Sequence, residues 1–186
     1  MEPDYGKVKE IAGATLRTII SGLPGEFADR EKRLYGDLTT SKDSSFKKLE
    51  QIYSLMDSLL AYVSKYIPCR EGCSDCCYLK VPISSIEADY IQARAGIRQA
   101  INLENKNLFG SPCPFLKAGS CSFYAYRPFV CRRHVALYDS PRWCRLELCG
   151  KYKFPVFRRT VIESSFEYLV SADSAGFFYD IRQVFT

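Results

Sequence analysis

Hydrophobic positions in the N-terminal third of the chain recur at helical spacing. From residue 46 onward the apolar side chains lie three or four residues apart, which places them on one stripe of an α-helix. The stripe consists of Phe46, Leu49, Tyr53, Met56, Leu60, Val63 and Ile67. Ser44 or Ser45 can cap this helix, and Pro68 marks its end.

A second N-terminal helix is predicted from about Tyr5 to Ile20, and it stops at the turn-forming segment 21–25, Ser-Gly-Leu-Pro-Gly. The polar stretch from Gly36 to Ser45 is interpreted as a loop. We expect the two helices to be a scaffold rather than a surface for a partner, because core packing is the usual use of an apolar stripe.

The elements in the middle of the chain are shorter. Alternating apolar residues from Tyr78 to Ile83 predict a short strand, which Pro82 confines to a sheet edge. Residues 84–87, Ser-Ser-Ile-Glu, form a capping box that opens a helix through about Ile101. Residues 102–112 are predicted to be a loop.

Residues 113–150 show no sustained period and are rich in Cys, Pro, Arg and aromatic residues. Irregular backbone of this kind needs something other than regular secondary structure to hold it in place, and a bound metal can do so. The tail is predicted to form a helix from about Thr160 to Ala172, followed by a short apolar end around 177–185.

Together these elements predict a mainly α fold with little β. We expect a single metal-organised domain with a helical N-terminal part and an irregular cysteine-rich half. Residues 1–68 are the helical region that packs on the core, and residues 69–149 are the cysteine-cluster metal-binding domain. Residues 150–186 add a C-terminal helix and tail that complete it.

Composition narrows the chemistry. The chain has 186 residues, of which 47% are hydrophobic and 25% charged, as in a soluble globular protein. All nine cysteines lie between Cys69 and Cys149, a local density of about 11% that is typical of disulfide scaffolds or metal sites. The acidic N-terminus lacks the plan of a signal peptide, and no apolar run approaches the ~18 residues of a membrane span. We therefore expect a cytoplasmic chain with reduced thiols, and metal ligation is the interpretation that remains.

Positive charge gathers in the same window. Of the formal net charge of +5, residues 69–149 carry +4, from eleven basic and seven acidic side chains. Such an excess is commonly a solvated face, and it does not require nucleic acid. We favour a second interpretation: four thiolates around Zn²⁺ or a [4Fe–4S]²⁺ core leave a net charge of −2, which nearby arginines would offset.

The first cysteine group has the spacing of metal ligands. Cys73 and Cys76 form a C-x-x-C pair that lets both sulfurs bind one ion, and Gly72 before them can take a positive φ. The adjacent Cys76 and Cys77 diverge on either a strand or a helix. These two therefore serve different sites, or one is a ligand and the other lies beside it.

Further motifs follow in a fixed order over about residues 69–149. They are Cys69-x3-Cys73-x2-Cys76-Cys77, Cys113-Pro114-Phe115-Leu116, Cys121-Ser122-Phe123-Tyr124, Arg127-Pro128, Cys131-Arg132, Ser140 and Cys144. In these motifs the chain resembles the cysteine-cluster family, whose zinc- or iron-chelating domain has a C-x-x-C-x-x-C-C type signature. The resemblance implies a bound metal or iron–sulfur cluster, and a flagellin lysine N-methylase looks like one of the longer members of the family.

The resemblance also implies a pool of eight ligands, which are Cys69, Cys73, Cys76, Cys77, Cys113, Cys121, Cys131 and Cys144. Eight thiols can make two four-cysteine sites, as zinc would favour, or one [4Fe–4S] cluster with spare thiols beside it; an iron ion is a further option. The adjacent pair and the long gaps favour iron–sulfur slightly. Cys149 lies outside the family pattern, and the only histidine, His134, ranks below the cysteines as a ligand.

Arg127 and Arg132 are predicted to bind the cofactor by donating hydrogen bonds to thiolate or to an anionic substrate, whereas Arg133 is expected at the surface. The pattern predicts a metal-binding protein that acts with a protein partner in redox chemistry, metal handling or protein modification. One alternative is an accessory or catalytic unit of a protein (lysine) N-methylase-like enzyme. Another is a zinc-ribbon-like nucleic-acid binder, although nucleic acid is the less expected partner. Whether the chain is itself an enzyme stays open.

Overall fold

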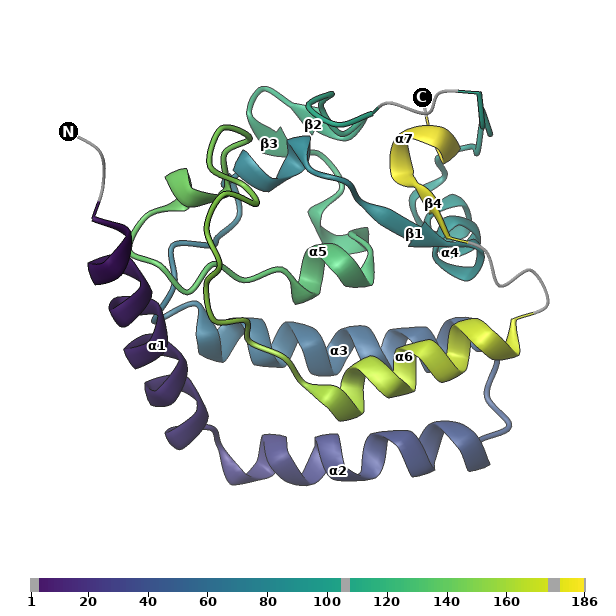
Figure 1. Ribbon diagram of the computed structural model, residues 1–186. Helices are drawn as coiled ribbons and strands as arrows, with labels where there is room; N and C mark the ends of the chain where they lie inside the picture. Colours follow the sequence, from purple (N-terminus) through teal and green to yellow (C-terminus); the bar gives the residue numbers. More distant parts are fainter. Residues whose placement is uncertain (1–3, 105–107, 174–177, 186) are drawn as a thin grey trace.

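Four long helices form one side of the molecule. The computed structural model describes residues 4–104, 108–173 and 178–185. Helices α1 (Tyr5–Ser21), α2 (Gly25–Thr40) and α3 (Ser45–Val63) follow one another, and α6 (Thr160–Ala172) packs against both α2 and α3 (Figure 1). The predicted helices at 5–20 and 160–172 are confirmed.

Helix α3 begins where its sequence predicts and ends earlier. The Ser44 hydroxyl accepts a hydrogen bond from Lys47 N at 3.4 Å, which is the predicted cap. The helix ends at Val63, before Pro68, because a tight turn follows in which Tyr66 N donates to Val63 O. Ile67 still packs against the core from this turn, so the apolar stripe outlasts the helix.

The prediction of a loop over 36–45 is wrong for its first half, which belongs to α2. Glycine and threonine disfavour helix, but Phe27, Leu34 and Leu38 are buried at steps of seven and four along α2. Tertiary burial therefore outweighs local propensity in this helix. The loop is limited to the segment between Thr40 and Ser45.

The observed strand lies later in the chain than predicted, and the helix after it is shorter than predicted. Strand β1 (Pro82–Ser84) pairs antiparallel with β4 (Phe178–Asp180), whereas the segment before it forms the 3₁₀ turn η1 (Asp75–Tyr78). The capping box at Ser84 is confirmed and opens α4 (Ser85–Ala95). This helix stops well before the predicted Ile101, because Gly96 takes the left-handed conformation, with φ of 68°, that ends helices.

The cysteine-rich half is built from short pieces. Strands β2 (Leu116–Lys117) and β3 (Ser120–Cys121) form a hairpin, followed by the 3₁₀ turn η2 (Tyr124–Tyr126) and helix α5 (Phe129–Arg133). The 3₁₀ turn η3 (Pro141–Cys144) carries the next cysteine. The apolar end predicted around 177–185 becomes β4 and α7 (Ile181–Val184), except for Phe177, which lies outside the described residues.

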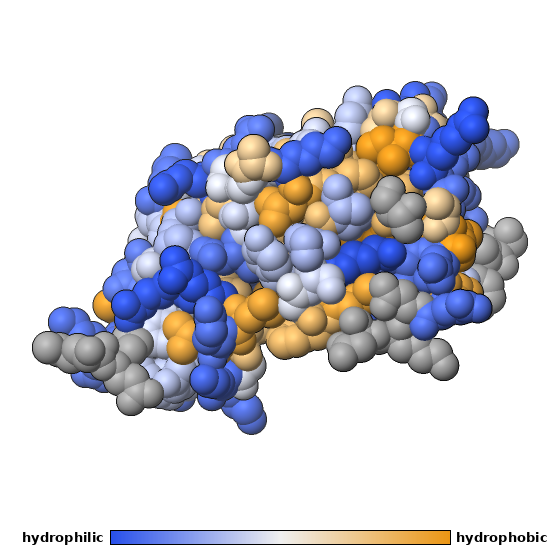
Figure 2. Space-filling model, turned by 90° about the horizontal axis from the view of Figure 1, so that it is seen from above, coloured by the Kyte–Doolittle hydropathy of each residue, from blue (hydrophilic) through white to orange (hydrophobic). Residues whose placement is uncertain are grey.

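Two apolar clusters hold these parts together. The larger one joins the long helices through residues such as Leu49, Ile52 and Ile162, and the smaller one gathers side chains of β1, α4, α7 and the cysteine-rich half. The predicted fold class is confirmed: seven α-helices and four short strands in the described ranges make a single, mainly α domain. Figure 2 shows the face above the cysteine-rich half, where apolar side chains reach the surface between charged ones. No helix in the described part of the chain has the length and apolarity that crossing a bilayer requires.

Candidate metal centre

Eight cysteines line one cavity of about 490 Å³ between α3 and the cysteine-rich half. They are Cys69, Cys73, Cys76, Cys77, Cys113, Cys121, Cys131 and Cys144, the full pool of predicted ligands. All are free thiols. Cys149 is exposed and is not among the residues that line this cysteine cavity.

The first segment curls into the cavity through two turns. Gly72 has a φ of 89°, the positive value expected from its place before the C-x-x-C pair, and Cys73 N donates to Arg70 O at 3.0 Å. Turn η1 then presents Cys76 and Cys77 together. The Cys76 thiol is hydrogen-bonded to the Cys77 sulfur, which lowers the pKa of Cys77 to about 7 and raises the pKa of Cys76.

The second segment meets the first through a direct backbone bond. Cys113 N donates to Cys77 O at 2.9 Å, and the hairpin of β2 and β3 turns the chain back so that Cys121 follows. The hairpin turns at Ala118 and Gly119, both of which take a positive φ. Backbone N–H groups of Phe115 and Phe123 are hydrogen-bonded to the Cys113 and Cys121 sulfurs. Donors of this kind stabilise thiolates in metal sites.

The buried thiols are neutral unless a cation ionises them. Burial raises the pKa of Cys113 to about 11 and that of Cys144 to about 12, and it also raises the pKa of Cys131. A metal ion reverses this effect, because its positive charge binds the thiolate and not the thiol. The cysteines of this cavity are therefore suited to bind a cationic group, and they are poorly suited to react singly as thiolate nucleophiles.

The two predicted arginines differ in how their donors are used. Arg132 donates to Arg127 O at 2.9 Å and to Ala125 O at 2.6 Å and pairs with Asp57, so each nitrogen of its guanidinium has a partner within the protein. Arg127 stacks on Tyr124 at 3.7 Å, and its buried Nε has no hydrogen-bond partner among the described residues. An orphaned donor at the wall of a thiol-lined cavity is the feature expected where a sulfur-rich anionic group binds.

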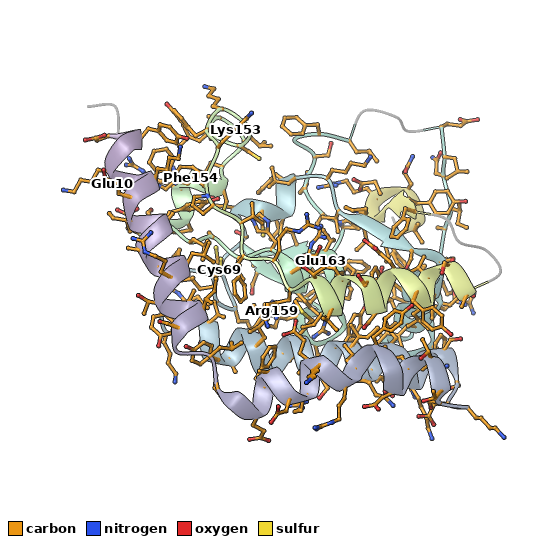
Figure 3. All side chains as sticks on the ribbon, turned by 60° about the horizontal axis from the view of Figure 1, so that its bottom comes forward. Glu10, Cys69, Lys153, Phe154, Arg159 and Glu163 are labelled. Carbon is orange, nitrogen blue, oxygen red and sulfur yellow. The ribbon has the colours of Figure 1, made fainter. Side chains whose placement is uncertain are left out.

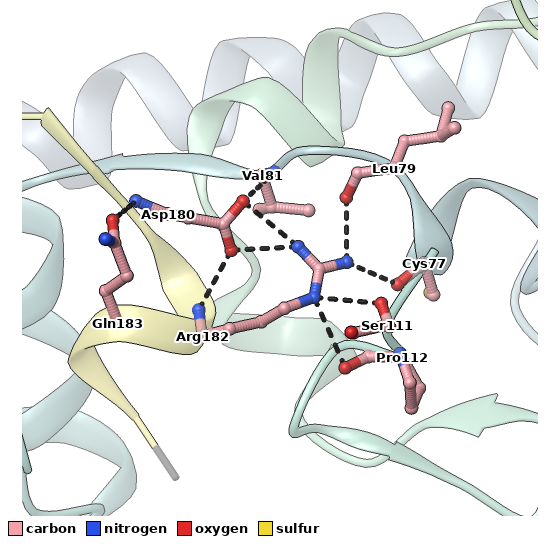
Figure 4. Close-up of polar contacts among 8 residues, drawn as sticks. All are labelled: Cys77, Leu79, Val81, Ser111, Pro112, Asp180, Arg182 and Gln183. Carbon is pink, nitrogen blue, oxygen red and sulfur yellow. Dashed lines mark hydrogen bonds and ion pairs between the residues drawn. The ribbon is translucent and has the colours of Figure 1, made fainter. Parts of the chain in front are cut away.

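A third arginine, which the sequence did not single out, ties the C-terminus to both cysteine segments. Arg182 is buried and pairs with Asp180 at 2.8 Å (Figure 4). Its guanidinium also donates to carbonyl oxygens on both segments, namely those of Cys77, Leu79, Ser111 and Pro112. We call this group the Arg182 clamp. The sequence does not predict the Arg182 clamp, because the partners of Arg182 are backbone carbonyls from distant parts of the chain.

Glu87 has a larger role than its capping box indicated. Besides closing the box with Ser84, its buried carboxyl group accepts hydrogen bonds from Tyr53 Oη of α3 at 2.8 Å and from Phe129 N of α5 at 2.6 Å. Glu87 thus joins α3, α4 and the helix that carries Cys131.

His134 lines the cavity, and its Nε2 lies 3.7 Å from Cys144 Sγ. The lone histidine is therefore a neighbour of a predicted ligand. Arg133 is exposed, as expected, and lies 3.7 Å from Glu163 of α6. Figure 3 shows Glu163 near the start of α6 together with Arg159, which pairs with the buried Glu31 of α2.

The thiols surround a space wider than one ion. Within the described ranges, no three Cys, His, Asp or Glu side chains lie close enough together to hold a single metal ion. A tetrahedral zinc site with Zn–S bonds of about 2.3 Å would place its sulfurs about 3.8 Å apart. The donor set fits thiolate-bound metal.

Comparison with known proteins agrees with this chemistry. Residues 68–152 match a family model, CxxCxxCC, described as "Putative zinc- or iron-chelating domain". The match confirms the family resemblance that the ordered cysteine motifs indicated. Neither the curated proteins nor the solved structures include a significant match to this chain.

Proposed function

We propose that the chain binds iron as an iron–sulfur cluster of the [4Fe–4S] type in its cysteine cavity, since residues 68–152 match the model of the cysteine-cluster family with its zinc- or iron-chelating domain. The protein would act as a redox centre for a protein partner. The main observation behind this proposal is that eight thiols line one wide cavity without converging on a single-ion position.

The surroundings support a cluster in two ways. Phe123 and Ile181 contribute apolar surface to the cavity wall, and a hydrophobic shell keeps water from a cluster and tunes its potential. The orphaned Nε of Arg127 can donate to cluster or ligand sulfur, and its charge offsets the net negative charge of a four-thiolate centre. Arg132 would act indirectly, by holding the Arg127 loop.

The cluster, when bound, supplies one-electron redox chemistry. The chain's own residues supply thiolate ligands, exclude water and provide a buried cation. The sequence has no G-x-G-x-x-G or P-loop motif for a nucleotide cofactor, and we propose a partner protein as the electron donor or acceptor.

Anaerobic purification of the full chain tests the proposal. We expect brown protein with iron and acid-labile sulfide in equal amounts and a broad visible absorption band. Colourless protein with about two zinc ions per chain would overturn the iron–sulfur proposal and identify two structural zinc sites. Iron without sulfide would instead indicate a mononuclear iron site.

Two cysteine substitutions test the ligand set directly. Cys73→Ser should lower the metal content and reduce the ordered structure of residues 69–149, because a ligand is lost from a segment that the metal organises. Cys149→Ser should leave metal content unchanged, since this side chain is exposed and outside the cavity. Metal analysis and circular dichroism check both. Equal loss of metal from the two variants would contradict the proposed ligand set.

A further inference from the structure

We infer that the eight cavity cysteines form two separate metal centres, an inner group of Cys77, Cys113, Cys121 and Cys131 and an outer group of Cys69, Cys73, Cys76 and Cys144. This inference rests on the proposed metal-binding function of the cavity and adds the number and composition of its centres. The spacing in the sequence leaves the division open, and the contacts of each sulfur decide it.

The inner group belongs to the smaller apolar cluster. All four of its cysteines pack there with Ile181 and Phe185 of the C-terminal segment, and no outer cysteine does. Electrostatic interactions link the same four: Cys131 interacts with the other three thiols, and Cys113 interacts with both Cys77 and Cys121. The Arg182 clamp binds the backbone on both sides of this group, at 77–79 and 111–112.

The outer group lies among loops and polar side chains. Cys69 Sγ accepts a hydrogen bond from Ala136 N at 3.2 Å, and Cys144 interacts electrostatically with Cys69 and Cys73. Turns η1 and η3 pack against each other, which brings Cys76 of the C-x-x-C pair towards Cys144. His134 Nε2 also lies in this group, beside the Cys144 sulfur.

Cys76 and Cys77 mark the boundary. Cys76 interacts with Cys77 and Cys131 on one side and with Cys144 on the other. Adjacent side chains rarely bind one ion together, and the C-x-x-C spacing pairs Cys76 with Cys73. Assigning the adjacent cysteines to different centres gives each centre four thiols. Arg127 interacts with Cys69 and Cys121, one from each group, so its charge serves both.

The two groups differ in their neighbours and not in their burial. The inner group packs in the smaller apolar cluster and is held by the Arg182 clamp, whereas the outer group has His134 and the Arg145–Asp75 ion pair beside it. Each group contains one buried and three half-buried cysteines.

Single and paired substitutions in the anaerobically purified full chain test the division. Cys113→Ser, in the inner group, and Cys144→Ser, in the outer group, should each lose about half of the metal. Cys69→Ser/Cys144→Ser should lose no more than Cys144→Ser alone, because both residues serve one centre. Cys149→Ser should behave as the wild type.

Each outcome separates this inference from the proposed function. If either single substitution removes all of the metal, or if the double outer variant loses clearly more than its single parent, the division is wrong even though the chain binds metal. Zinc in place of iron, with each single variant keeping one of two ions, would overturn the iron–sulfur proposal and leave the division standing. If Cys113→Ser does not fold, the comparison between the single and double outer variants decides.

Discussion

Replacing Arg182 with alanine should lower the free energy of unfolding by about 3–5 kcal/mol, because it leaves the buried carboxylate of Asp180 without its partner. The same change removes the donors to four carbonyl oxygens that flank Cys77 and Cys113. Arg182→Lys should recover little, since a single ammonium cannot reach carbonyls on both sides as a planar guanidinium does. Urea unfolding followed by circular dichroism measures the loss.

Arg133→Ala is the matched control. Its guanidinium is exposed and makes one loose ion pair, so its removal should cost less than about 1 kcal/mol. Metal analysis of Arg182→Ala adds a second measurement, in which metal loss should fall on the inner group. If Arg182→Ala is as stable as the control, apolar packing of Ile181 and Phe185 alone holds the C-terminus, and the Arg182 clamp has no stabilising role.

The sequence predicts those parts of the fold that depend on local signals. The capping box at Ser84, the serine cap of α3 and the turn at Ala118 and Gly119 are each specified by a few adjacent residues, and the structure contains all three. Helix α2 was missed because its stability comes from burial against α6 and α3, which no local signal contains.

In the site, too, features set by neighbouring residues were predictable and features set by distant contacts were not. Eight candidate ligands were identifiable, because clustered cysteines with C-x-x-C spacing are rare without a metal. The grouping of the thiols could not be predicted from the sequence, because it depends on the packing of residues 178–185 against two distant segments. Arg182 and Glu87 were missed in their tertiary roles for the same reason: their partners are backbone groups and side chains far away along the chain.

Replacing Glu87 with alanine should also destabilise the fold by about 3–5 kcal/mol. Its two carboxyl oxygens accept four hydrogen bonds in the core, and two of the donors are the backbone N–H groups of Ser84 and Phe129. Glu87→Gln should cost about 1–3 kcal/mol, because each oxygen faces one of these N–H groups and the amide NH₂ must oppose one of them. Glu10→Ala, at an exposed helix position, should change stability by less than about 0.5 kcal/mol.

The pH dependence of Glu87 gives this prediction a second, independent readout. Burial raises the pKa of Glu87, although its hydrogen bonds oppose the shift, so the folded protein binds the proton more tightly than the unfolded chain. Its contribution is fully present below the unfolded pKa of about 4.3 and is lost as pH rises through the folded pKa. The stability of the wild type relative to Glu87→Gln should therefore increase as the pH falls from 7 towards 4. A constant difference over this range would mean that the four hydrogen bonds balance the effect of burial, so that the pKa of Glu87 is the same in the folded and unfolded chain.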